Sequence, residues 1–228
     1  AVNDPARMAS AYAGVAVASD GNNTIVIRGN APNGLLWRME GVDIPNPNHF
    51  SAVGTSGGGI SILSAQLLSN SDFMTGAFAA EYGNALSGVF DLKPRKGNAK
   101  KREYTFQAGV LGLDAAMEGP LRLGNQTGSY LVNYRYSTLS VLSKLGVNIG
   151  DAQTNFQDLS FNVWLPAGKW GQFTLFGLGG LSDQTYAGVA DSLLWKEEGD
   201  KQYSWDFRAH TGVLGLTRGL AAEMAPKV

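Results

Sequence analysis

Residues 80–93, AEYGNALSGVFDLK, decide how the rest of the chain is read. The segment begins with a compact turn, EYGN at 81–84, and Gly88 then allows another part of the backbone to approach closely. A short apolar strand follows at 89–92, and a basic exit ends at Gly97. The sequence before this segment predicts mixed helices and strands, whereas the sequence after it predicts long alternating strands only. We therefore expect two architectures to meet here.

The first 97 residues predict a small α/β unit with a mixed sheet and short helices. Asp4-Pro5 is a typical helix start, with Asp as the cap and proline at the first helical position, and a short helix follows over 7–13. A second, weaker helix is expected at 61–69, and the glycine- and asparagine-rich segment 44–59 is too polar to be core. Strands are expected at 15–17, 24–28, 35–39, 73–75 and 89–92.

From residue 103 onward the sequence alternates with a period of two, which is the pattern of β-strands. Six antiparallel strands are expected, at about 103–109, 112–121, 128–137, 155–166, 171–182 and 203–217. In the third strand, one face carries Tyr130, Val132, Tyr134 and Tyr136, and the other carries Leu131, Asn133, Arg135 and Ser137. One apolar face and one polar face fit either an antiparallel sandwich or a barrel in a membrane.

The connections between these strands favour the membrane barrel. Those at 124–127 and 167–169 are short, whereas those at 138–154 and 183–202 are long. Short and long connections alternate in this way when one rim of a barrel carries tight turns and the other carries loops. The aromatic residues near strand ends would form the interfacial girdles: Tyr130, Tyr136, Trp164, Phe173 and Trp205. The outward face of a soluble sandwich would carry many more lysine and glutamate residues.

Composition excludes several classes of function. The net charge is −1 and no basic block is longer than Lys100-Lys101-Arg102, so we do not expect nucleic-acid binding. The chain has no cysteine, which excludes a disulfide scaffold, thiol catalysis and zinc–thiolate sites. Hydrophobic residues make up 44% of the chain and charged residues 16%, which predicts a folded protein with few surface charges. No run of about 18 apolar residues is present, so no membrane-spanning helix is expected.

Four motifs, in order along the chain, resemble those of the TonB-dependent outer-membrane receptors. They are IVIRG at 25–29, MEGVDIP at 39–45, EYGN through GVFD at 81–91, and GPL followed by GSY at 119–130. The family's Glu-Val-x-x-Gly-Pro segment is represented only loosely, by residues 72–77. The resemblance covers nearly the whole chain. It implies an α/β plug domain at 1–97, followed at 98–228 by the first antiparallel strands of a transmembrane β-barrel.

The resemblance also implies the scope of the chain. The family closes about 22 strands around its plug, and six strands cannot close a barrel of that size. The sequence shows neither a signal peptide nor the family's N-terminal box that contacts TonB. We therefore expect a segment of a longer receptor. The form of the motif at 82–88 and the strand SYLVNYRY at 129–136 look most like receptors of the Bacteroidetes.

The function implied by the resemblance is energised uptake across the outer membrane of a Gram-negative bacterium. The plug would gate the barrel lumen and bind a scarce nutrient, namely a siderophore, cobalamin, a glycan or a peptide. Expected partners are TonB, the remainder of the barrel, outer-membrane lipid and a surface lipoprotein. We expect no enzymatic activity, cofactor or metal. The alternative is a soluble or cell-surface β-rich module that binds ligands or mediates adhesion, with no role in transport.

Candidate site residues fall into two groups. Ligand binding is expected from polar loop residues and an aromatic platform: Asn30, Asn33, Asn46, Asn48, His49 and Phe50. A polar network between plug and barrel is expected from three charged residues, Arg28, Glu81 and Arg95, although each could also be an ordinary surface charge. GTSGG at 54–58 resembles a serine-protease motif, but no acidic residue lies between His49 and Ser56 to complete a triad in that order. With only two histidines, His49 and His210, no metal-ligand spacing is present.

Overall fold

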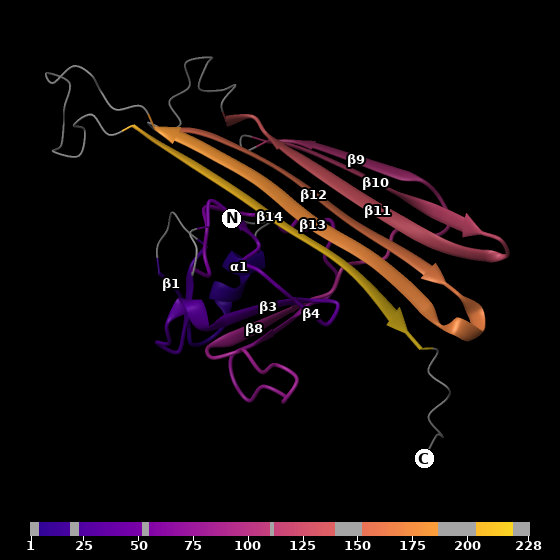
Figure 1. The fold of residues 1–228 in the computed structure, drawn as a ribbon, viewed down its shortest axis with the longest axis horizontal. Helices are drawn as coiled ribbons and strands as arrows, with labels where there is room; N and C mark the ends of the chain where they lie inside the picture. The colour runs from indigo at the N-terminus through magenta and orange to yellow at the C-terminus, as the bar shows by residue number, and fades with distance from the viewer. Residues whose placement is uncertain are drawn as a thin grey trace, which may run out of the picture.

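The computed structural model describes residues 5–18, 23–51, 55–109, 112–139, 152–186 and 204–220. It has two parts (Figure 1). An α/β segment, the N-terminal unit (residues 5–97), lies against one face of a long, twisted antiparallel sheet, the large sheet. Within the described residues, no helix is long and apolar enough to cross a membrane.

The N-terminal unit consists of short elements around a four-stranded sheet. Its helices are α1 (Pro5–Met8), η1 (Ala9–Ala11) and η2 (Pro32–Gly34). Its strands are β1 (Val15–Val17), β2 (Ile25–Ile27), β3 (Leu35–Met39), β4 (Val42–Ile44), β5 (Asn48–His49), β6 (Ile60–Ser61), β7 (Asp72–Met74) and β8 (Gly88–Leu92). The four-stranded sheet has the order β4-β3-β8-β7 with β3 and β8 parallel, and β1–β2 and β5–β6 are antiparallel pairs.

The two parts of the molecule share one hydrophobic core. Trp37 of β3 stacks on Phe90 of β8 with a centroid distance of 4.2 Å. Ile25 of β2 belongs to the same buried cluster, which continues into the large sheet through Phe176 and Leu178. Burial of aromatic and aliphatic side chains from both parts therefore holds the N-terminal unit on the sheet.

The large sheet contains six consecutive antiparallel strands. They are β9 (Glu103–Ala108), β10 (Gly112–Leu123), β11 (Gln126–Ser137), β12 (Ala152–Pro166), β13 (Gln172–Tyr186) and β14 (Trp205–Gly219). All six strands expected from the alternation are present, and most of them are longer than expected. Three connections are short: residues 109–111 separate β9 from β10, residues 124–125 join β10 to β11, and a 3₁₀ turn, η3 (Gly168–Trp170), joins β12 to β13.

The outward face of the large sheet, which points away from the N-terminal unit, is an apolar band. Strand register aligns its side chains in rows across β11 to β14. Three successive rows are Tyr134-Leu159-Gly179-Gly212, Val132-Phe161-Gly177-Leu214 and Tyr130-Val163-Leu175-Leu216. Beyond them, toward residues 155 and 208, the row Asn155-Asp183-Arg208 is polar. Rows two residues apart lie about 6.8 Å from each other along a strand.

Where it meets the N-terminal unit, the inward face carries buried polar side chains beside the apolar Phe176 and Leu178. Its buried side chains include Asn133, Asp158, Ser160, Asn162 and Ser182. The alternation predicted for β11 and β12 is thus confirmed, with the apolar side outward. Trp164, which we expected in an outward aromatic girdle, lies instead on this inward face, because it has the same parity along β12 as Asp158. The side chain of Trp205 lies outside the described residues.

Two expectations for the N-terminal unit are wrong. Residues 61–69 form no helix, because the hydroxyls of Ser61 and Ser64 accept hydrogen bonds from the backbone N–H groups of Leu63 and Gln66. Such local bonds offer the backbone an alternative to the helical pattern. The segment 44–59 is partly core, since it contains β5, whose residues are fully buried. The helix cap expected at Asp4 and most of the long connections lie outside the described residues.

Candidate functional site

The β5–β6 hairpin carries the contact between the two parts, and asparagine side chains hold it in shape. The Asn23 amide donates to Asn48 Oδ1 at 3.1 Å, and the Asn48 amide donates to Asn46 Oδ1 at 2.6 Å. The Asn46 amide in turn donates to the carbonyls of Thr55 and Gly57, both at 2.9 Å. This chain of bonds fixes the loop that returns over β5, and it uses side chains that we had assigned to a ligand.

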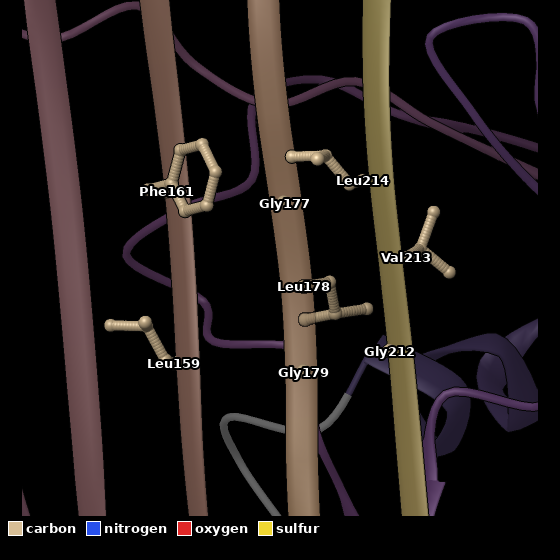
Figure 2. A pocket seen from close by; sticks show the side chains of 8 residues that line it. All are labelled: Leu159, Phe161, Gly177, Leu178, Gly179, Gly212, Val213 and Leu214. Atoms are coloured by element: carbon tan, nitrogen blue, oxygen red, sulfur yellow. The ribbon is translucent and has the colours of Figure 1, made fainter.

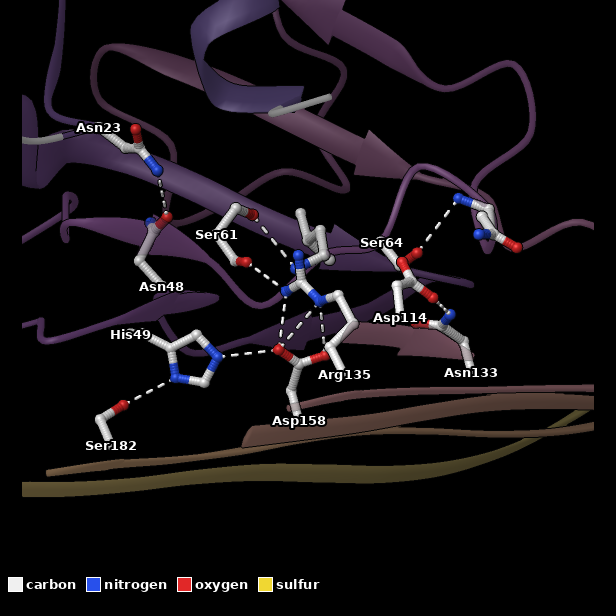
Figure 3. Close-up of polar contacts among 12 residues, drawn as sticks. Asn23, Asn48, His49, Ser61, Ser64, Asp114, Asn133, Arg135, Asp158 and Ser182 are labelled. Atoms are coloured by element: carbon white, nitrogen blue, oxygen red, sulfur yellow. Dashed lines mark hydrogen bonds and ion pairs between the residues drawn. The ribbon is translucent and has the colours of Figure 1, made fainter. Parts of the chain in front are cut away.

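His49 is inserted into the inward face of the large sheet (Figure 3). It is 0% exposed, and its two ring nitrogens contact two different strands. Nδ1 lies 2.7 Å from Ser182 Oγ of β13, and Nε2 lies 2.9 Å from Asp158 Oδ2 of β12. A neutral imidazole with its proton on Nε2 satisfies both bonds, because Asp158 accepts and the Ser182 hydroxyl donates. His49 therefore fixes the position of the hairpin on the sheet.

Asp158 is held at the same time by Arg135 of β11. Arg135 Nε lies 2.9 Å from Asp158 Oδ1 and Arg135 Nη2 lies 2.7 Å from Oδ2, which is a bidentate pair. Arg135 Nη2 also donates to the carbonyl of Ser61 in β6. The positive charge of Arg135 compensates the fully buried carboxylate, as burial of a charge requires. We call His49, Ser61, Arg135, Asp158 and Ser182 the buried contact.

The buried contact contains the residue types of a catalytic triad without the arrangement of one. In a serine hydrolase the carboxylate orients a histidine that takes the proton of an accessible serine. Here Ser182 is 4% exposed, so no substrate reaches its hydroxyl. The Asp158 carboxylate is also neutralised by Arg135 instead of being free to stabilise an imidazolium. The arrangement supports docking of the hairpin, not nucleophilic catalysis.

Apolar side chains flank the buried contact. A Cβ atom added at Gly180 would lie 2.7 Å from Ile62 Cδ1 and 2.9 Å from His49 Cε1, so the hairpin approaches β13 closely at this glycine. The ring of Phe156 lies 4.8 Å from that of His49. Phe50, with a φ of 58°, places its ring 6.5 Å from that of Phe207 in β14. Phe50 thus contacts the sheet in addition to any role in ligand binding.

A second polar contact, which we call the peripheral contact, is made by the segment after β8. Arg95 forms a bidentate pair with Glu118 of β10, with N–O distances of 2.8 and 2.7 Å. Glu118 also accepts from the backbone N–H of Asn98 at 2.7 Å. The Asn162 amide of β12 donates to the Arg95 carbonyl at 2.9 Å. Arg95, one of the three residues expected in a network between the two parts, therefore lies at their contact.

The chain between Arg95 and Asn98 is pressed against the sheet. A Cβ atom at Gly97 would lie 2.1 Å from the backbone oxygen of Tyr130, so only glycine fits without a shift of the backbone. Lys96 Nζ lies 4.0 Å from the ring centroid of Trp164, a cation–π contact on the inward face. This packing explains why the basic exit after residue 92 is glycine-terminated.

Arg28 and Glu81, the other two residues expected in that network, contact the N-terminal unit itself. Arg28 has a φ of 52° and places Nη2 3.4 Å from Thr75 Oγ1. Glu81 pairs with Arg38 of β3 at 3.1 Å. The structure does not bring either residue to the described part of the large sheet, because both belong to turns that fold back on the four-stranded sheet.

The EYG turn near residue 82 covers the polar face of β3 and β8. Arg38 lies 5.0 Å from the ring centroid of Tyr82, and the Tyr82 hydroxyl donates to Asp91 at 3.1 Å. Loss of hydration, followed by this hydrogen bond to Asp91, raises the pKa of Tyr82. Burial and the charge of Asp91 also raise the pKa of Glu40. These contacts fix the EYGN turn at 81–84 on the four-stranded sheet.

The remaining ligand candidates are placed differently from one another. Asn30 and Asn33 are exposed in the turn before β3 and remain available to a ligand. Asn48 and His49 are 2% and 0% exposed, and their side chains are used in internal hydrogen bonds, so they are not ligand residues in this conformation. Among the described residues, no group of three or more histidine, cysteine, aspartate or glutamate side chains could hold a metal ion.

Sequence reasoning missed the half of the buried contact that the large sheet supplies. Arg135, Asp158 and Ser182 lie on the polar strand faces, but alternation alone does not show which positions meet across strands. One signal was present: Arg135 and Asp158 are opposite charges on inward faces that otherwise carry mainly serine and asparagine. Charges on an inward face are costly unless paired, so an arginine and an aspartate there predict each other.

Comparison with known proteins places this fold. No family model and no curated protein matches the chain. Among solved structures, the chain is similar to the siderophore receptor PirA from Acinetobacter baumannii, with a TM-score of 0.53 and 18% sequence identity. It is also similar to a mutant of the ferric enterobactin receptor PfeA from Pseudomonas aeruginosa in complex with enterobactin, with a TM-score of 0.49 and 18% identity. Each match covers 84% of this chain and 32% of the receptor, so the chain spans about a third of either protein. The likeness to PirA confirms, at the level of the fold, the receptor architecture expected from the motifs.

Proposed function

We propose that the chain is the plug (1–97) and the first barrel strands (98–228) of a TonB-dependent outer-membrane transporter. One observation carries this proposal. The same six strands present an apolar band outward and hold a folded α/β unit inward through buried polar side chains. A barrel in a membrane needs lipid-compatible side chains outside, and its interior is polar. A plug supplies the partners for those interior polar groups.

The exposed apolar residues speak against a soluble binding or adhesion module. Every strand from β9 to β14 exposes at least one leucine, tyrosine or phenylalanine side chain on the outward face. A contiguous exposed patch of this kind marks a membrane or protein contact, since soluble monomers rarely show patches above a few hundred Å². If lipid covers the outward face, these apolar side chains are no longer exposed to water, and the fold needs no change.

The polar part of the contact, which lies beside the shared hydrophobic core, suits a plug that must yield. Breaking hydrogen bonds and ion pairs in the presence of water exchanges them for bonds to water, so a neutral bond contributes only about 0.5–1.5 kcal/mol net and a bond to a charged group about 1.5–3 kcal/mol. An apolar contact of the same size would have no such replacement. TonB pulling on the plug from the periplasm would release the buried contact and the peripheral contact, and thereby open a path along the inward face.

The proposed cargo is a scarce nutrient. PirA is described as a siderophore receptor, which puts ferric siderophores first among the candidates that include cobalamin, glycans and peptides. Asn30 and Asn33 are the exposed candidates for ligand contact. TonB, the remainder of the barrel and a surface lipoprotein are the proposed protein partners. The likeness of the motifs to Bacteroidetes receptors stays a prediction.

A reversible tether tests whether the plug moves during transport. Ile62→Cys and Gly180→Cys in the full-length polypeptide would place two thiols within disulfide reach, because Gly180 faces Ile62. The chain contains no other cysteine that could compete for this pairing. We expect uptake of labelled ferric siderophores to stop when the disulfide forms and to return on reduction. The reduced protein is its own control. Undiminished uptake with the disulfide intact would show that this contact does not open.

Membrane location is tested separately on the native protein. We expect antibodies to residues 1–97 to detect a band in the outer-membrane fraction whose mobility changes on boiling. A band of about 24.2 kDa in the soluble fraction would contradict the transporter and favour the soluble module.

A further inference from the structure

Arg135, which neutralises Asp158 in the buried contact, has a second carboxylate on its other side (Figure 3). In the strand register, Arg135 of β11 is opposite Asp158 of β12 and also opposite Asp114 of β10. Directly opposed residues of an antiparallel pair have Cβ atoms only about 4.5–5.5 Å apart. One inward row across three strands therefore carries two negative charges and one positive charge.

The carboxylate of Asp114 has no cationic partner while the hairpin is docked. Its Oδ1 accepts a hydrogen bond from the side-chain amide of Asn133 at 2.5 Å. Among the residues that the structure describes, Asp114 forms no ion pair. Asp114 is also partly exposed, so its second oxygen does not need a protein donor in this state. It is an acceptor that the docked arrangement leaves unused.

The β5–β6 hairpin determines which carboxylate Arg135 contacts. Nη2 donates both to the carbonyl of Ser61 and to Asp158, and Nε donates to Asp158. These bonds leave Nη1 without a hydrogen-bond partner among the described residues. His49 holds the same Asp158 carboxylate through Nε2. When the hairpin leaves, both the Ser61 bond and the His49 bond are lost together.

The outward face of the sheet offers Arg135 no alternative. The neighbouring outward row is Tyr134-Leu159-Gly179-Gly212. Figure 2 shows Leu159 and the two glycines on that face, with hydrocarbon side chains around them. Within the described sheet, a second partner for Arg135 must therefore lie on the inward face, where Asp114 is adjacent.

We propose that Asp114 is the alternative partner of Arg135, and that the guanidinium bridges Asp114 and Asp158 when the β5–β6 hairpin leaves the sheet. The docked state gains little from Asp114, because Arg135 and Asp158 already neutralise each other. The open state gains a new ion pair, which replaces the lost bond to Ser61. Asp114 therefore favours opening, and it keeps the arginine on the uncovered wall paired. The inference rests on the proposed function only for the force that opens the hairpin.

Asp114→Asn in the full-length polypeptide tests the direction of this effect. The amide keeps the shape of the side chain and an oxygen that accepts from Asn133, but it cannot form the ion pair. We expect amide hydrogen exchange of β5 and β6 to become about two- to five-fold slower, the size of a partly exposed ion pair. Unchanged or faster exchange would overturn the proposal, because a carboxylate that only supports the docked state would give faster exchange when removed.

Two control variants show whether the effect requires Arg135 and this position. In the background Asp158→Leu/Arg135→Met no arginine is left to move, so adding Asp114→Asn should not change the exchange of β5 and β6. An equal slowing there would overturn the role of Arg135. Glu118→Gln removes another carboxylate from the same strand and face, but Glu118 pairs with Arg95 in the docked state. It should make residues 95–98 exchange faster and should not slow β5 or β6.

The outcomes separate this inference from the proposed function, because local opening is measured without transport. Uptake of labelled ferric siderophores by the wild type, combined with unchanged or faster exchange in Asp114→Asn, would overturn the alternative pair and retain the transporter. Slower exchange in Asp114→Asn, in a protein recovered from the soluble fraction, would retain the alternative pair and overturn the transporter.

Discussion

The two polar contacts between the N-terminal unit and the large sheet use the same chemistry in different surroundings. Each joins an arginine to a carboxylate in a bidentate pair. In the buried contact, the side chain of Asp158 is 0% exposed and that of Arg135 is 20% exposed. In the peripheral contact, the side chains of Glu118 and Arg95 are 12% and 35% exposed. Burial, not pairing geometry, distinguishes them.

This difference in burial predicts which contact holds the N-terminal unit in place and which contact loosens first. A buried pair gives little net stability compared with an apolar replacement, but the loss of one partner leaves an uncompensated charge. The buried contact therefore forms only when the N-terminal unit and the large sheet are correctly aligned, and it breaks as a whole. A partly exposed pair loses little when broken, because water replaces the missing partner. The peripheral contact is suited to loosen first.

Removal of the buried carboxylate should have the largest effect. Asp158→Ala leaves Arg135 without its partner and His49 Nε2 without an acceptor, and the free energy of local opening of β5–β6 should fall by about 3–5 kcal/mol. Amide hydrogen exchange in the full-length polypeptide measures this opening, and β5 and β6 should exchange roughly 100-fold faster or more. The matched control is the double variant Asp158→Leu/Arg135→Met, which removes both charges. It should exchange more slowly than Asp158→Ala, and the opposite order would contradict the importance of burial.

A pair of glycine substitutions compares the stiffness of the two contacts. At Gly97 an added Cβ meets the backbone oxygen of Tyr130 at 2.1 Å, whereas at Gly180 it meets the side-chain ends of Ile62 and His49. The end of the Ile62 side chain can rotate away and a strand backbone cannot, so Gly97→Ala should cost about 2–3 kcal/mol and Gly180→Ala about 1–2 kcal/mol. Local hydrogen exchange at residues 95–98 and 48–49 measures each. A larger loss for Gly180→Ala would show that the buried contact is the stiffer one.

Salt should separate the two ion pairs. Glu118→Gln breaks the bidentate pair with Arg95 but leaves a hydrogen-bond acceptor, so the peripheral contact should weaken by about 1 kcal/mol at low ionic strength. Added salt should reduce this difference between wild type and variant, because a partly exposed pair is screened. The effect of Asp158→Ala, measured alongside, should change little with salt. Equal salt dependence of both variants would contradict the assigned difference in burial.

The large sheet was predictable from sequence because its signal is local. Alternation along β11 and β12 separates residues such as Tyr134 and Asn133 without any knowledge of their partners. The buried contact is not predictable from sequence, since His49 and Asp158 are 109 residues apart. They meet only because β5 packs against β12 and β13. For the same reason the sequence predicts His49 as a loop residue that binds ligand. A polar segment becomes core only when another part of the chain supplies its hydrogen bonds.

The smallest expected effect concerns Glu40, whose charge lies near the peripheral contact. Burial and the charge of Asp91 raise its pKa, and the nearby Lys96 and Lys93 oppose this increase. The folded state therefore holds a proton on Glu40 more tightly than the unfolded state, whose value is near 4.5. Stability should consequently fall as pH rises from about 4.5 through the raised folded value, and Glu40→Gln should remove this decrease. Hydrogen exchange of β3 and β4 over a pH series, corrected for the intrinsic rate, should show the variant more stable at neutral pH by less than about 0.5 kcal/mol, with no difference in acid. Parallel pH profiles for wild type and variant would mean that Glu40 stays as well hydrated in the folded protein as in the unfolded chain.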